Sequence, residues 1–156
     1  MSDYASNSWY RGLLQKYKNK LQVCQNKVVR YILEYKSRHH LYVSDFKEVG
    51  FLDVENRVDF FTLSLMYSIY HGTAPSYFSD FDAPSHSHRT RNSNMAYLIP
   101  NVHSQGKCSF QYNGILLWNK LPQKIKSIKV KNMFKSECKL MLMDKMFKKE
   151  SCEFTV

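Results

Sequence analysis

Glycine and proline are scarce in this chain of 156 residues, with five and four copies. This scarcity excludes collagen-like and low-complexity chains, which are rich in one or both residues. The sequence also contains no internal repeat. Apolar residues make up 44% of the chain and aromatic residues 15%, which is enough to build a packed core. The composition therefore predicts a globular protein.

Long apolar runs are also missing, because no stretch approaches the ~18 apolar residues that a membrane-spanning helix needs. The first residues are polar and lack the apolar core of a secretory signal. Without an export signal, we expect reduced thiols at the four widely spaced cysteines, Cys24, Cys108, Cys138 and Cys152. We expect no membrane contact and an intracellular location, cytoplasmic, nuclear or both.

The patterns of catalytic and metal sites are absent as well. The sequence has no Cys-x-x-Cys pair, no phosphate-binding glycine loop and no two adjacent aspartates. Histidine and cysteine are common zinc ligands, but the spacings of the four candidates match no standard zinc motif. The four are His86, His88, His103 and Cys108. We therefore expect no catalytic residue, no metal ion and no cofactor.

Positive charge is in excess, with a net charge of +10, and it is unevenly distributed. Residues 11–38 contain eight Lys or Arg and one acid, Glu34. Residues 39–83 contain seven acids and two bases, and residues 120–149 contain ten Lys and two acids. A basic protein attracts polyanions, and nucleic acid is the commonest of these. A solubilising surface is the alternative interpretation. The two basic segments either share one surface or each pair with the acidic middle, and the sequence does not decide between these arrangements.

Residues 9–37 predict one long helix. Its apolar residues recur at alternating steps of three and four, which is typical of a helix with one apolar face: Leu14, Tyr17, Leu21, Cys24, Val28, Tyr31 and Tyr35. Lysines and arginines occupy the opposite face. Such a helix needs to bury its apolar face against other elements or another chain.

The rest of the chain predicts further helices. Capping residues and apolar periodicity predict them over four ranges: residues 44–49, 53–70, 109–120 and 130–148. Residues 95–100 predict a short extended or β segment, which Pro100 limits to the edge of a sheet. The fold class is therefore mainly α, with about five or six helices.

The organisation follows from these elements. We expect a flexible N-terminus over residues 1–8, one helical domain over residues 9–148 and a tail over residues 149–156. Within the domain, a polar and basic loop separates the N-terminal from the C-terminal helices. The three parts of the domain are residues 9–81, 82–107 and 108–148.

Five motifs follow one another in a specific order. They are KLQVCQNKVVR at 20–30, GFLDVENR at 50–57, MYSIYHGTAPSY at 66–77, HRTR at 88–91 and YNGILLWNKLP at 112–122. This ordered set resembles the C-terminal region of LINE-type (non-LTR) retrotransposon reverse transcriptases of the jockey kind. The resemblance covers nearly the whole chain, from about Trp9 to about Leu142.

The resemblance implies that this chain corresponds to the part of such a polymerase that follows the palm. In that part, thumb and connecting helices hold template and primer. The family's polymerase site is a pair of adjacent aspartates that hold two metal ions, and this chain has no such pair. The endonuclease of these elements is also missing. We therefore expect no enzymatic activity from this chain alone, although the parent polyprotein would be an RNA-directed DNA polymerase.

Eight cations are the candidate nucleic-acid-binding residues. They are Lys16, Lys18, Lys20, Lys27 and Arg30 on the long helix, and Arg89, Arg91 and Lys107 around the basic loop. Thumb-like helices contact phosphates with such side chains, and guanidinium groups suit phosphate geometry. The alternatives are a solvated helix face and a mobile basic loop. Trp118 is either a base-stacking platform or a core residue, and its leucine neighbours favour the core.

The expected function is non-catalytic binding of the RNA or DNA backbone. The alternative is a protein-interaction module or a non-functional remnant of a retrotransposon polyprotein. In that case the apolar face of helix 9–37 would contact the missing palm and fingers, or a second copy of the chain.

Overall fold

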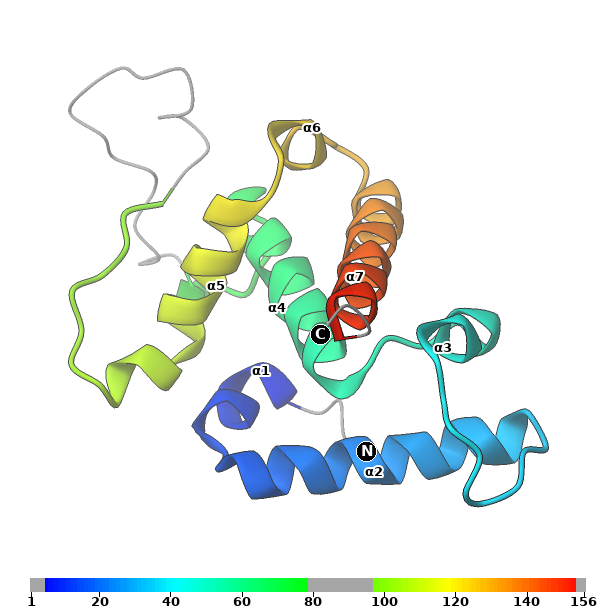
Figure 1. The fold of residues 1–156 in the computed structure, drawn as a ribbon. Helices are drawn as coiled ribbons and strands as arrows, with labels where there is room; N and C mark the ends of the chain where they lie inside the picture. The colour runs from blue at the N-terminus through cyan, green and yellow to red at the C-terminus, as the bar shows by residue number, and fades with distance from the viewer. Residues whose placement is uncertain (1–4, 79–96, 154–156) are drawn as a thin grey trace.

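Residues 5–78 and 97–153 are described by a computed structural model, with side chains up to residue 151, and its fold is mainly helical (Figure 1). The predicted fold class is thereby confirmed. The α-helices of the described residues are α1 Ser6–Trp9, α2 Gln15–Ile32, α3 Val43–Val49, α4 Val54–Tyr70, α5 Phe110–Lys120, α6 Gln123–Lys126 and α7 Lys131–Glu153. The 3₁₀ turns are η1 Tyr10–Gly12, η2 Ser76–Phe78 and η3 Gly106–Cys108.

Helix α4 lies at the centre of the molecule and packs against α5, α7, α1 and α2. Asp53 caps its start, because the Asp53 carboxylate accepts a hydrogen bond from the Asn56 backbone N–H at 2.7 Å. Gly72, with a φ of 65°, follows its end. The predicted helix 53–70 is therefore confirmed, including its capping residue.

Helix α5 begins at the predicted cap, since the Ser109 hydroxyl accepts from the Tyr112 N–H at 3.2 Å. Trp118 on this helix is completely buried, and its ring centroid lies 5.1 Å from that of Tyr70 and 6.0 Å from that of Phe134. Trp118 is thus a core residue rather than an exposed stacking platform. Helix α5 ends before Pro122, as the sequence predicts.

Helix α7 contributes to both hydrophobic clusters of the described structure. Phe134 and Cys138 belong to a first cluster, together with Trp118 of α5 and residues of α4. Leu142 and Met146 belong to a second cluster, which includes residues of α2 and α3. The helix continues to Glu153, so part of the expected tail is helical.

The prediction of one helix over residues 9–37 is wrong at both ends. Before α2, the chain forms α1 and the 3₁₀ turn η1, and Leu13 and Leu14 are extended. After α2, Glu34 has a φ of 55°, which an α-helix does not allow. Gly12 weakens a helix that passes through it, and the side chain of the preceding Arg11 binds α4 instead.

The predicted extended segment 95–100 is described only from Tyr97 onward, and residues 97–100 form no strand. The Asn119 side chain makes the two backbone hydrogen bonds with Tyr97 that a neighbouring strand would otherwise make. The Tyr97 backbone N–H donates to Asn119 Oδ1 at 2.9 Å, and Asn119 Nδ2 donates to the Tyr97 carbonyl at 2.8 Å. These two bonds hold the buried Tyr97 against α5.

No helix within residues 5–78 and 97–153 has the length and apolar content required to cross a membrane.

Candidate nucleic-acid interface

Three of the predicted lysines lie together on one side of α2. Lys16, Lys20 and Lys27 are all exposed and follow one another at steps of four and seven residues. With a rise of about 1.5 Å per residue, the row is about 16 Å long. The sequence of α2 contains no acid. In the described part of the chain, none of the three lysines belongs to an ion pair.

The other two predicted cations of α2 contact segments outside the helix. Lys18 is half-buried on the inner side of the helix, and its Nζ lies 5.3 Å from the centroid of the Tyr10 ring. The Arg30 Nε donates a hydrogen bond to the His39 carbonyl at 2.7 Å. In the outer row, Lys16 and Lys20 lie over the Tyr17 ring of the same helix, at 5.0 and 5.8 Å from its centroid. The structure therefore separates five cations that look equivalent in the sequence into an outer row of three and two residues that contact other segments.

The remaining predicted residues do not join this row. Lys107 is exposed in η3, beside the start of α5. Arg89 and Arg91 lie outside the described residues, as do His86 and His88. Within the described residues, no three His, Cys, Asp or Glu side chains gather as they would around a metal ion.

The orientation of α2 is set by glutamine side chains on its inner face. Gln25 Nε2 donates to the Leu52 carbonyl at 2.7 Å, and Gln22 Oε1 accepts from the Val54 N–H at 3.0 Å. Gln22 also donates to Asn26 at 2.8 Å. These bonds satisfy backbone groups where the chain enters α4. They turn the row Lys16, Lys20 and Lys27 outward.

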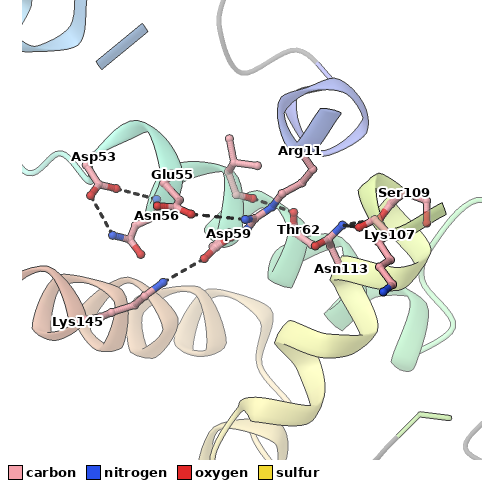
Figure 2. Close-up of polar contacts among 11 residues, drawn as sticks. Arg11, Asp53, Glu55, Asn56, Asp59, Thr62, Lys107, Ser109, Asn113 and Lys145 are labelled. Carbon is pink, nitrogen blue, oxygen red and sulfur yellow. Dashed lines mark hydrogen bonds and ion pairs between the residues drawn. The ribbon is translucent and has the colours of Figure 1, made fainter. Parts of the chain in front are cut away.

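A buried carboxylate holds the segment before α2 in place. Figure 2 shows Arg11 of η1 and Lys145 of α7 reaching Asp59 of α4 from different sides. Arg11 donates to Asp59, and Lys145 Nζ lies 3.4 Å from its other carboxylate oxygen. Arg11 also pairs with Glu55 at 3.6 Å. Burial raises the pKa of Asp59 above the ordinary carboxyl value, against the lowering effect of Arg11 and Lys145.

The start of the second lysine-rich segment lies far from α2. Lys120, Lys124 and Lys129 are exposed around the corner formed by α5, α6 and the start of α7. In Figure 1, α6 and α2 lie at opposite ends of the molecule. Farther along α7, Lys145 pairs with Asp59 of the acidic middle segment. The fold therefore separates the start of the second basic segment from α2. The end of that segment lies beside α2, where Lys149 and Lys18 line one pocket.

Sequence reasoning missed the roles of Gln22, Gln25 and Asp59. Asp59 lies between Val58 and Phe60 on the apolar helix α4, and this position could have indicated an internal ion pair. A carboxylate is buried in a protein only when it has hydrogen-bond or ion-pair partners. The glutamines gave no comparable signal, since their partners lie 27 and 32 residues away in the sequence.

Comparison with known proteins gives no match to a protein family, to a curated protein or to a solved structure.

Proposed function

We propose that this chain binds the backbone of RNA or DNA through Lys16, Lys20 and Lys27 on the outer side of α2. The observation that supports this most directly is the row itself: three exposed ammonium groups on one rigid helix whose sequence has no acid. Double-stranded nucleic acid presents one negative charge per roughly 1.7 Å of axis. A row of about 16 Å can therefore contact several phosphates at once.

Two further observations support the proposal. The net charge of +10 favours approach to any polyanion. The ordered motifs resemble the region after the palm of LINE-type reverse transcriptases, and we propose that this chain is a non-catalytic piece of that kind. Phosphate contacts by lysine are insensitive to base sequence, so the proposed binding has little sequence preference. A primer-extension assay on the isolated chain should show no nucleotide incorporation.

The test is the salt dependence of binding to a short mixed-sequence DNA duplex, measured by fluorescence anisotropy. Each neutralised phosphate contributes about 0.9 to the slope of log K against log salt. The triple variant Lys16→Ala, Lys20→Ala, Lys27→Ala should therefore have a slope shallower by about 2.7 than that of the unmodified chain.

The matched control is Lys120→Ala, Lys124→Ala, Lys129→Ala, which removes the same number of exposed lysines at the opposite end of the molecule. This control should keep the original slope. If the control flattens the slope and the α2 variant does not, the interface lies at the α5–α6–α7 corner and the proposal is wrong.

A further inference from the structure

The apolar face of α2 is exposed rather than packed against the body of the protein. Tyr17, Leu21, Cys24, Val28 and Tyr31 follow one another at alternating steps of four and three residues. Tyr17 is 44% exposed, Val28 48% and Tyr31 85%. We call these five residues the α2 stripe. At about 1.5 Å per residue it is about 21 Å long, whereas Val29 is the one residue of α2 that is fully buried.

The outward direction of this stripe is fixed by contacts. The hydrogen bonds from Gln22 and Gln25 to the chain around Leu52 and Val54 occupy the inner face of α2. Rotating the helix to bury the stripe would break these bonds and leave backbone groups at the start of α4 unsatisfied. The exposed stripe is therefore a stable property of the folded chain.

A groove runs beside the stripe. It contains a cavity of about 330 Å³, lined among others by Trp9, Leu21, Cys24, Val28, Phe51 and Val54. The cavity is recessed between α2 and the start of α4, so a rod that carries apolar side chains can fill it, whereas a flat surface meets only its rim. An apolar ridge with a groove at its side is the geometry in which amphipathic helices dock, with anchor residues at steps of three and four.

The charges around the groove determine which kind of amphipathic helix can dock there. The sequence predicted the lysines on the face opposite the stripe, but Lys16, Lys20 and Lys27 follow one edge of it, with Lys16 and Lys20 over the Tyr17 ring. Arg57 lines the cavity on the side of α4. No acidic side chain lines the cavity among the described residues. A second copy docked through the same surface would place these cations against their own counterparts, which repel one another. A helix with acids beside its apolar positions would instead place carboxylates against them.

We propose that the α2 stripe and its groove are a docking site for an amphipathic helix of another protein, with leucine-like residues at its apolar positions and Glu or Asp beside them. This site differs from the proposed nucleic-acid contact in its apolar part, which consists of Val28, Tyr31 and the groove. The lysine row contributes to both sites, so an acidic helix and a nucleic acid compete for the same chain.

The test uses two designed peptides of about three heptads with leucine at the a and d positions. One peptide has Glu at the e and g positions and the other has Lys. We expect the acidic peptide to bind the full chain at least tenfold more tightly than the basic one by fluorescence anisotropy. The double variant Val28→Gln, Tyr31→Gln should weaken that binding at least tenfold.

The matched control is Met133→Gln, Leu140→Gln, which removes two apolar side chains of α7 that are 60% and 59% exposed. It should leave peptide binding unchanged. Thiol labelling provides a second readout, because the bound acidic peptide should protect Cys24 and leave the exposed Cys108 reactive. Both glutamine variants should keep the salt-dependent binding to DNA, so failure of the docking site and failure of the nucleic-acid site are distinguishable.

Four results would overturn the proposal. Equal binding of the two peptides would show that charge does not select the docked helix. Binding of neither peptide would show that the α2 stripe and its groove are not a docking site for such a helix. A dimer in sedimentation velocity that Val28→Gln, Tyr31→Gln converts to monomer would assign the stripe to a second copy. Binding to vesicles of phosphatidylserine and phosphatidylcholine that the same variant abolishes would assign it to an anionic lipid surface.

Discussion

At the scale of single residues, one side-chain type occupies several environments in this protein. Lys20 is exposed on α2, whereas Lys126 is buried, with its Nζ donating to the Asn119 carbonyl at 3.2 Å. Burial lowers the pKa of Lys126. The cysteines differ in the same way, since Cys24 is exposed beside the groove and Cys138 is buried in the first cluster. Reactivity therefore follows position in the fold.

Cys138 gives a prediction at this scale. Burial raises the pKa of its thiol to about 12, with a smaller contribution from Glu137. The thiolate is the reactive form, so in a Cys152→Ser background Ellman's reagent at pH 8 should label Cys24 and Cys108 quickly. Cys138 should react only after urea unfolds the chain. Fast labelling of three thiols in the native protein would contradict this.

The same shift makes stability depend on pH. The folded chain keeps the Cys138 proton at a pH where the unfolded chain has released it. The contribution of the protonated Cys138 thiol to the free energy of unfolding is complete below the ordinary thiol pKa. This contribution is lost as the pH rises toward 12. Relative to Cys138→Ala, the unmodified chain should therefore lose stability between about pH 9 and pH 12 in urea titrations.

At the scale of elements, the crossing of α4 and α5 depends on Gly114. A Cβ atom added at Gly114 would lie 2.8 Å from Met66 Sδ and 3.2 Å from Met66 Cγ. Met66 is completely buried, so it has little room to move. The two helices approach each other at the one position of α5 that has no side chain.

Gly114→Val should therefore lower the free energy of unfolding by about 2–3 kcal/mol, since overpacking a buried site forces neighbours out of their rotamers. The control is Gly12→Val, because a Cβ atom at Gly12 has no neighbour within 4 Å. We expect the control to change stability by less than about 0.5 kcal/mol. Urea unfolding followed by far-UV circular dichroism measures both. Equal effects of the two variants would argue against close packing at Gly114.

At the scale of the whole molecule, α7 joins two hydrophobic clusters into one structure. Phe134 lies in the first cluster and Leu142 in the second. Phe60 and Met141 pack against both clusters. A disturbance in either cluster is therefore transmitted to the other through one helix and two shared side chains.

This connection predicts a single unfolding transition. In a Trp9→Phe background, Trp118 is the sole tryptophan and reports on the first cluster. Leu142→Ala in the second cluster should lower stability by about 2–4 kcal/mol. It should shift the Trp118 fluorescence transition and the far-UV circular dichroism transition to the same urea concentration. A Trp118 transition that does not move would show that the clusters unfold separately.

The sequence by itself determined the features that depend on a few neighbouring residues. Local hydrogen bonding and periodicity predict the helical class of the fold, the caps Asp53 and Ser109 and the end of α5 before Pro122. The structure contains all of these features. The core position of Trp118 follows equally from its apolar flanks. These interactions span three or four residues, so the order of the residues is sufficient to predict them.

Only the tertiary structure decided which face of α2 turns outward, and with it both proposed sites. Periodicity identified the stripe and the lysine row, but not their direction. That direction depends on Gln22 and Gln25, which bind backbone groups 32 and 27 residues away, and on the pairing of Arg11 with Asp59, 48 residues away. Contacts over such separations form only when the chain is folded, because their cost in loop closure is compensated by the packing of the whole molecule.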